Sequence, residues 1–299
     1  MFRTKDELRK SLRTHGFGER DIDLIVQRAR PRYHFVERSG SDELSAEPYR
    51  VPASVERNSP LGTTKFGGSP DLPRHIPWPI RPPVLADERL DEDESEEFGK
   101  SKRAADLRQQ QLRERASLDS SFPLTFLFQL DLKSIDSSKL SFDLPNTGRL
   151  LLFRDARPQL CEVYHLIYDN SPPSLLERRP MPDVSHLPGH EDEDWFFFYV
   201  LPATLCEPKL GMSPPLDDNG CPDSYGDWWF SSDNLAWCTS GVGGPGDNDD
   251  PGMIMILELH SNEDHCVSYA IDMTLRVYMT AGDLKARRFD RAVFESHTA

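Results

Sequence analysis

Cysteine, serine and histidine side chains are the groups in this sequence from which a nucleophilic site would be built. Cys238 stands beside Ser240, and nine histidines are available to activate a thiol. The sequence contains no GxSxG and no HExxH segment. The sequence alone does not show whether Cys238 lies close to a histidine in the fold. We therefore favour a packed, inert thiol and predict no catalytic residue. An enzyme that uses Cys238 or scattered aspartates remains the alternative.

Two histidine clusters have spacings that suggest metal binding. His186 and His190 stand four apart, which on a helix would place both imidazoles on one face. Pro188 lies between them and excludes that helix. His260 and His265 are five apart, and in an extended strand such residues point to opposite faces. We therefore predict no metal site and no cofactor.

A glycine-rich segment, Gly241 to Gly246, formally matches the GxGxxG fingerprint of dinucleotide binding. That fingerprint needs a helix after it, whereas aspartates and Pro251 follow here. The proline disfavours the helix, and the aspartates would repel a pyrophosphate. Asp247, Asp249 and Asp250 lack the spacing and the later glutamate of a calcium loop. We interpret residues 241–252 as a solvated acidic loop.

Composition narrows the class of protein. The chain has 299 residues and a net charge of −15, so we expect a protein partner and no nucleic acid. No apolar run is long enough for a transmembrane helix and the N-terminus is charged from its third residue, so we expect no membrane association. Five cysteines without a CxxC pair indicate reduced thiols and a cytoplasmic location.

The elements that must position these side chains begin with two short helices. Thr4 and Glu7 have the spacing of a capping box, and a second helix from about Asp21 ends at Arg30-Pro31. A DNA-reading helix pair is the alternative to simple docking, and the overall acidity disfavours it. The chain then divides into a helical segment 1–38, a Pro-rich extended segment 39–84, a charged insertion 85–121 and a core 122–299, with 60–299 forming a single domain around the insertion.

The core is predicted to consist mainly of strands. Runs rich in Leu, Phe, Ile and Val predict strands at 123–132, 149–153, 161–168, 195–201, 253–259, 266–271, 275–279 and 291–295. A short helical turn is predicted at Asp283-Leu284. The run FLFQLDL followed by RLLLF is similar to IMILELH followed by LRVYM, which we interpret as a weak internal repeat.

Several of these segments together resemble the YwqG-like family of unknown function. They are KFGGSPDLP at 65–73 with Trp78-Pro79, PLTFLFQLDL at 123–132 and GRLLLF at 148–153, with a looser fit near 275–294. The resemblance implies an α+β fold of mainly antiparallel sheets with internal duplication. Some members of the family look like immunity proteins to bacterial toxins, and the family fixes no catalytic residue.

We therefore expect a non-catalytic, protein-binding protein, most specifically an immunity-type inhibitor that neutralises a toxin such as a nuclease. An acidic surface would steer association with a basic partner, and exposed tryptophans would anchor it. An acidic scaffold protein is a further alternative. The predicted contact residues are Glu191, Asp192, Glu193, Asp194, Trp195, Asp227, Trp228 and Trp229.

Overall fold

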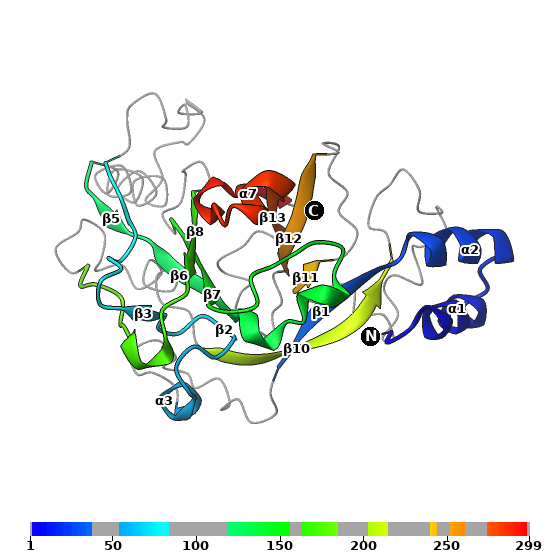
Figure 1. Cartoon of the computed structure of the whole chain (residues 1–299), viewed down its shortest axis with the longest axis horizontal. Coiled ribbons are helices and arrows are strands. Elements are labelled where there is room, and N and C mark those ends of the chain that lie inside the picture. Colours follow the sequence, from blue (N-terminus) through cyan, green and yellow to red (C-terminus); the bar gives the residue numbers. More distant parts are fainter. Residues whose placement is uncertain are drawn as a thin grey trace, which may run out of the picture.

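A curled antiparallel sheet of ten strands organises the chain in the computed structural model (Figure 1). The structure describes residues 2–37, 54–83, 119–155, 163–184, 203–214, 240–243, 252–260 and 274–297. The strands follow one another across the sheet in the order β14-β13-β12-β11-β1-β10-β2-β6-β7-β8. Mainly antiparallel sheet with a few short helices agrees with the predicted α+β class.

The bounds of the sheet strands are β1 (Arg30–Glu37), β2 (Lys65–Phe66), β6 (Thr125–Asp131), β7 (Arg149–Arg154), β8 (Tyr164–Asp169), β10 (Thr204–Ser213), β11 (Gly241–Gly243), β12 (Met253–His260), β13 (Thr274–Thr280) and β14 (Val293–His297). Two small ladders join β3 (Asp71–Pro73) to β9 (Leu176–Arg178) and β4 (Ile80–Arg81) to β5 (Phe122–Pro123). The α-helices are α1 (Lys5–Thr14), α2 (Glu19–Arg28), α3 (Ser54–Asn58) and α7 (Ala281–Lys285). Short 3-10 turns are η2 (Leu132–Ser134), η3 (Ser137–Lys139), η4 (Pro173–Leu175) and η7 (Phe289–Arg291).

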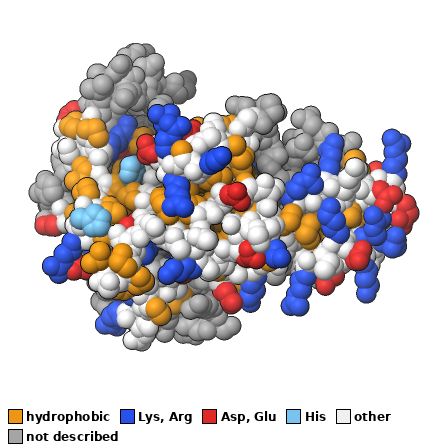
Figure 2. Space-filling view, viewed as in Figure 1, with side chains coloured by type: hydrophobic (Ala, Val, Ile, Leu, Met, Phe, Trp, Pro, Cys, Tyr) orange, Lys and Arg blue, Asp and Glu red, His pale blue; other side chains and the backbone are white. Residues whose placement is uncertain are grey.

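The two N-terminal helices form a hairpin at one end of the molecule (Figure 1). Thr4 is the N-cap of α1 as predicted, and its hydroxyl accepts from the Glu7 amide at 3.2 Å. The Glu7 carboxylate reaches back to the amide of Arg3 rather than to that of Thr4. The hairpin has its own apolar cluster, which consists of Phe2, Leu8, Leu12, Ile22, Ile25, Val26 and Ala29. Lys and Arg side chains gather over its outer surface among acidic ones (Figure 2).

Strand β1 was not predicted from the sequence. The segment 1–38 therefore contains, after its two helices, a strand that lies in the middle of the sheet between β11 and β10. Arg30, Pro31, Arg32 and His34 make the run RPRYHF polar, which concealed the strand. Arg32 and His34 are nevertheless buried.

The two halves of the sheet pair in matching registers. The order β1, β2, β6, β7, β8 in the first half has its counterpart in β10, β11, β12, β13, β14, and β1 pairs with β10 where the halves meet. Lys65 of β2 faces Gln129 of β6, as Gly241 of β11 faces Glu258 of β12. Register shifts interrupt the β6–β7 ladder between Phe126 and Phe128 and the β12–β13 ladder between Met255 and Leu257, just before Gln129 and Glu258.

Hydrogen bonds between the strands repeat this correspondence. The Thr64 carbonyl accepts from the Cys206 amide at 3.0 Å, and the Ser240 carbonyl accepts from the Phe35 amide at 2.9 Å. The Thr64 hydroxyl accepts from the Asp131 amide at 3.0 Å, and the Ser240 hydroxyl accepts from the His260 amide at 2.9 Å. Residues 64 and 240 therefore perform the same structural task in the two halves.

The main apolar core fills the inner face of the curl. It draws on strands from both halves, including Phe35, Phe66 and Phe128 in the first half and Leu257 and Val277 in the second. The first and last strands of the sheet approach each other across this core, because the rings of Tyr164 and Phe294 stack with centroids 5.3 Å apart. The curl thereby shields both outer strands on their inner side.

The Pro-rich segment 71–79 covers the outer face of the first half. Trp78 is buried against Phe153, with ring centroids 5.5 Å apart, and its indole N–H donates to the Leu124 carbonyl at 2.8 Å. Leu72, Leu124, Phe126 and Leu151 complete this cluster. Aromatic packing therefore holds this part of the Pro-rich extended segment against the sheet.

A bulge in β6 breaks the simple alternation expected of the strand predicted at 123–132. Strict alternation would place Phe126, Phe128 and Leu130 on one face. The bulge between Phe126 and Phe128 instead turns Phe126 to the outer cluster, while Leu127, Phe128 and Leu130 all join the inner core. All four side chains are buried, but on two different faces.

The remaining predicted elements are found close to their expected bounds where the structure describes them. The runs at 123–132, 149–153, 161–168, 253–259, 275–279 and 291–295 correspond to β6, β7, β8, β12, β13 and β14, and the helical turn at Asp283-Leu284 is α7. The strands predicted at 195–201 and 266–271 and nearly all of the insertion 85–121 lie outside the described residues. Among the described helices, none combines the length and the apolar character needed to cross a lipid bilayer.

Candidate functional site: a polar groove on a buried ionic network

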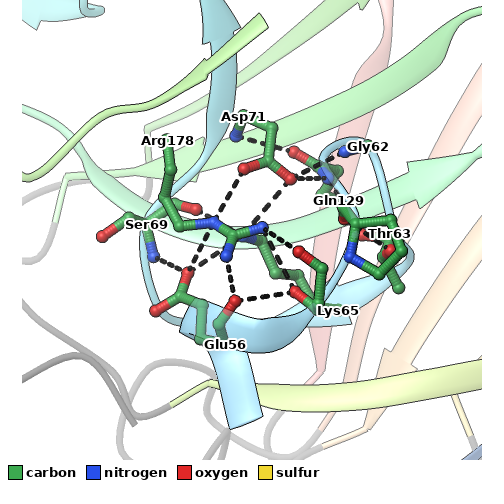
Figure 3. A network of polar contacts seen from close by, with 10 residues as sticks. Glu56, Gly62, Thr63, Lys65, Ser69, Asp71, Gln129 and Arg178 are labelled. Atoms are coloured by element: carbon green, nitrogen blue, oxygen red, sulfur yellow. Dashed lines mark hydrogen bonds and ion pairs between the residues drawn. The ribbon is translucent and has the colours of Figure 1, made fainter. Parts of the chain in front are cut away.

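A network of buried charges lies under the first half of the sheet, where α3, β2, β3, β6 and β9 meet (Figure 3). Its centre is the Lys65 ammonium, which is fully buried. Nζ donates to Glu56 Oε1 at 2.9 Å and to the Ser69 carbonyl at 2.5 Å, and lies 3.5 Å from Asp71 Oδ2. Glu56 and Asp71 are buried as well. A buried charge of this kind persists only when its partners are in place.

Arg178 closes the network from β9. Its Nε donates to Asp71 Oδ1 at 2.9 Å, and its terminal nitrogens donate to the Glu56 carbonyl and to Ser59. Two cations, Lys65 and Arg178, thus face two carboxylates, Glu56 and Asp71. Because the charges balance, the cluster is electrically neutral as a unit.

The ionisation of this network follows from its surroundings. Burial lowers the pKa of the Lys65 ammonium, and Asp71 and Glu56 oppose that shift. Burial alone would raise the pKa of the Asp71 carboxyl, but Lys65 and hydrogen bonds from Arg178, Gln129 and Gly62 hold it below its ordinary value. The geometry is that of a carboxylate surrounded by donors, so Asp71 is charged at neutral pH.

A groove of about 320 Å³ opens next to this network, at one end of β6, β7 and β8. Turns and strand ends form its walls, because the chain reverses there between neighbouring strands. The described residues that line it are Leu61, Gly62, Asp131, Lys133, Thr147, Gly148, Arg149, Asn170, Ser171, Pro172 and Pro173.

The buried network holds one wall of the groove from behind. The Gly62 amide donates to Asp71 Oδ2 at 2.9 Å, and Gln129 Nε2 donates to the Thr63 carbonyl and to Asp71 Oδ2, both at 2.9 Å. Gly62 has a φ of +87°, which favours glycine at this bend. The 60–64 loop is therefore fixed by charges that never reach the groove surface.

A second buried ion pair fixes the groove floor. Arg149 Nη1 donates to Asp169 Oδ2, and its Nη2 donates to the Ser171 carbonyl at 2.9 Å. The Ser171 amide donates back to Asp169 Oδ1 at 3.0 Å, which makes a tight turn that exposes Asn170. Gly148, with a φ of +86°, lies so close to this turn that an added Cβ would stand 2.5 Å from the Asp169 carbonyl oxygen.

The chemistry available in the groove is hydrogen bonding. Lys133 is exposed, and its ammonium makes no ion pair with a described residue. Asp131, Thr147 and Asn170 add a carboxylate, a hydroxyl and an amide. The described lining includes no histidine or cysteine, and no hydrogen bond between described residues pairs the Asp131 carboxylate with the Thr147 or Ser171 hydroxyl as a nucleophile and base would be paired.

A second buried cluster occupies the corresponding place in the other half of the sheet. Glu258 of β12 is fully buried, and it accepts from Arg32 at 2.5 Å and from Arg276 at 2.9 Å. His260 Nε2 lies 3.3 Å from Glu258 Oε2. Burial alone would raise the pKa of the Glu258 carboxyl, but Arg32, His260 and Arg276 hold it well below its ordinary value.

The sequence-predicted contact residues are not among those that the structure describes. Glu191, Asp192, Glu193, Asp194, Trp195, Asp227, Trp228 and Trp229 all lie outside the described residues, as does Cys238. The same holds for His186, His190, His265 and the aspartates at 247–250. Gly241 to Gly243, interpreted above as the start of a loop, is instead the buried strand β11.

The groove and network residues were missed in the sequence analysis. Lys65 and Asp71 lie in the KFGGSPDLP segment, and their charges within an otherwise apolar and glycine-rich run are a usable signal. Glu56 was assigned to a solvated loop, and Arg178 stands in a polar run. Among the described residues, no group of three or more His, Cys, Asp or Glu side chains is placed to hold a metal ion.

Comparison with known families places the site within a recognised unit. Residues 64–200 match a domain of unknown function, DUF1963. The match includes Lys65, Asp71, Gln129 and Arg178 of the network and most of the groove lining. It agrees with the expectation of a family of unknown function. No curated protein sequence matches the chain.

Proposed function

We propose that this protein acts by stoichiometric binding to another protein and catalyses nothing, most specifically as an immunity-type inhibitor that neutralises a toxin. The proposal rests on one observation: the charged groups of the network are buried and paired, whereas the accessible groups of the groove are polar. The ionised groups whose pKa is shifted, Lys65, Asp71 and Glu258, are buried and paired with one another or with arginines, as in a structural ion-pair network. The accessible groups in the groove are polar, and the described lining includes no histidine or cysteine.

The predicted acidic and aromatic contacts belong to the same proposal. Glu191 to Asp194 with Trp195, and Asp227 to Trp229, would steer and anchor a basic partner. The net charge of −15 supports this form of recognition, because a nuclease toxin carries a basic cleft that seeks phosphate.

The proposal includes an internal duplication and kinship with YwqG-like proteins. Its support is the matching strand order, the paired bulges and the equivalent hydrogen bonds of Thr64 and Ser240. Sequences of related chains test the duplication. Residues aligned with 30–169 and with 201–297 should resemble each other more in some relatives than they do here.

Capture of the partner is the experiment that tests the function. The full chain carrying an affinity tag is expected to retain one protein in a stoichiometric amount from an extract of its source organism. A partner encoded beside this gene, whose toxicity is suppressed by co-expression, is the expected outcome. Turnover of a substrate by the purified chain that is lost in Cys238→Ser would overturn the proposal.

Charge reversal tests the acidic contacts. Asp192→Lys with Asp194→Lys should slow association with the captured partner more than it speeds dissociation. The effect should shrink as salt rises, because the Debye length falls from about 10 Å at 0.1 M to about 3 Å at 1 M. Asp143→Lys with Asp290→Lys is the matched control, since both aspartates are exposed and lie outside the acidic run 191–194 in the sequence. Equal association rates for the two double variants would remove the steering mechanism.

A further inference from the structure

We infer that the groove beside the 60–64 loop binds a peptide main chain, either a free short peptide or an extended segment of a partner protein. The inference deepens the proposed function. Binding of a partner's extended segment rests on that proposed function, whereas binding of a free peptide does not. The juxtaposition that carries it is a neutral set of donors and acceptors between apolar walls, on a support that ionic networks hold fixed.

The charge of the groove argues against strongly anionic ligands. Asp169 compensates the Arg149 guanidinium at the floor, and the other two charged side chains of the described lining, Lys133 and Asp131, have opposite signs. A phosphate would meet only one uncompensated cation and one repelling carboxylate among the described lining residues. A single uncompensated carboxylate is also too few ligands for Ca²⁺, which takes about 6–8 oxygens.

The polar groups match what a peptide unit offers. Each residue of an extended peptide presents one N–H donor and one carbonyl acceptor. Asp131 supplies an acceptor for the N–H, and Lys133 and Asn170 supply donors for the carbonyl. None of the Lys133, Asn170 and Thr147 side chains makes a hydrogen bond to another described residue. Their bonding capacity is therefore available to a ligand.

The walls offer places for apolar side chains. Leu61 lines the groove and is 39 % exposed, and Pro172 and Pro173 add apolar surface to the lining. Apolar side chains beside a few polar groups are typical of pockets that bind small ligands. A volume of about 320 Å³ admits a few residues of an extended segment.

The support of the groove reduces the cost of binding. Gly62 is tied to Asp71, Gly148 is packed on the Asp169 carbonyl, and two consecutive prolines restrict the backbone of a further part of the lining. Because these walls are already ordered, little conformational entropy is lost when a peptide binds.

Amide NMR of the full chain with short peptides tests the inference. The probes are N-acetylated, C-amidated tetrapeptides with Leu, Ile or Val at the second position, titrated into isotope-labelled protein. The expected result is saturable shifts of the Gly62, Gly148 and Ser171 amides at millimolar peptide. Free leucine, which lacks the peptide units, should bind at least about tenfold more weakly, as expected when one or more hydrogen bonds to charged groups are lost.

A pair of exposed lysines supplies the matched control. Lys133→Glu should weaken peptide binding about tenfold, because a charge-assisted hydrogen bond is lost. Lys139→Glu makes the same change in charge in the next turn, η3, outside the groove, and should leave binding unchanged. Absence of saturable shifts, shifts centred elsewhere, or equal effects of the two substitutions would overturn the inference.

The test separates this inference from the proposed function. Peptide binding is measured on the isolated chain and does not need the natural partner, so failure to capture a partner would leave a positive result intact. Conversely, a captured partner could bind Lys133→Glu and wild type equally while no tetrapeptide binds. That result would refute peptide binding in the groove and leave the proposed protein binding intact.

Discussion

Arg32 in β1 donates a hydrogen bond to Glu258 in β12 across the whole width of the intervening strand β11, with Nη1 and Oε2 2.5 Å apart. The Arg32 side chain passes next to Gly241 of β11, which has no side chain to obstruct it. In the other half, the position that pairs in the same way as Gly241 holds Lys65, which supplies its own cation to Glu56 and Asp71. The two halves thus bury a cation at equivalent places but take it from different strands.

The first prediction concerns Gly241→Ala. An added Cβ would stand 2.4 Å from the Tyr33 carbonyl oxygen and 2.6 Å from Arg32 Nε, so the sheet or the ion pair must shift. We expect a loss of about 1–3 kcal/mol in the free energy of unfolding, measured by urea denaturation. Gly282→Ala in α7 is the control, because its nearest atom is 3.8 Å away and alanine favours a helix. Equal stabilities of the two variants would show that Arg32 does not cross β11 as described.

The second prediction concerns Glu258→Gln, which keeps the shape but removes the charge between Arg32 and Arg276. Leaving those guanidinium groups buried without their carboxylate should cost about 3–5 kcal/mol. Because the folded-state pKa of Glu258 lies below its unfolded value of about 4.5, its contribution is complete above that pH and is lost as pH falls through the lower folded pKa. The difference between wild type and variant should therefore shrink below about pH 4.5.

Urea denaturation of both proteins from pH 7 to pH 3 measures that difference. Asp71 also has a lowered pKa, so both proteins lose stability in acid, and only the difference reports on Glu258. A difference that is independent of pH would contradict the ionised state of Glu258.

The third prediction links the buried network to the groove through Asp71→Asn. Asp71 Oδ2 faces the donors of Gly62, Gln129 and Lys65, and Oδ1 faces Arg178, so an amide NH₂ finds no acceptor in either orientation. We expect a loss of about 3–5 kcal/mol. The Gly62 amide should also exchange its hydrogen faster, relative to global unfolding, than amides of β12.

Asp143→Asn serves as the control for that experiment. Asp143 is exposed and makes none of the network's hydrogen bonds or ion pairs, so both stability and Gly62 exchange should be unchanged. Unaltered Gly62 exchange in Asp71→Asn would show that the network does not hold the groove wall.

The sequence predicted the parts of the fold that depend on apolar patterning. Runs such as FLFQLDL and RLLLF predict buried strands because their residues are apolar throughout, and the capping spacing of Thr4 predicts α1. β1 and β11 were missed because RPRYHF is polar and GVG is short. Arg32 of β1 is buried against Glu258, which is 226 residues away, and β11 pairs with β1, which lies far earlier in the sequence.

The candidate site could not be predicted, for a related reason. Glu56, Lys65 and Arg178 come together only when three separate segments meet, and no local spacing connects them. The bulge at Leu127 is equally invisible, because an apolar run on a sheet buried on both faces has no alternation to interrupt.

The last prediction tests that bulge through pairs of phenylalanines. Phe128→Ala should cost about 3–5 kcal/mol, because its side chain is buried in the inner core. Milder Phe→Leu substitutions suit double-mutant cycles. Phe128 and Phe66, with ring centroids 4.8 Å apart, should couple by about 0.5–1.5 kcal/mol. Phe128 and Phe126 lie in separate clusters on opposite faces, so their effects should add within about 0.5 kcal/mol. Uninterrupted alternation would place Phe126 and Phe128 on one face and make that second pair couple instead.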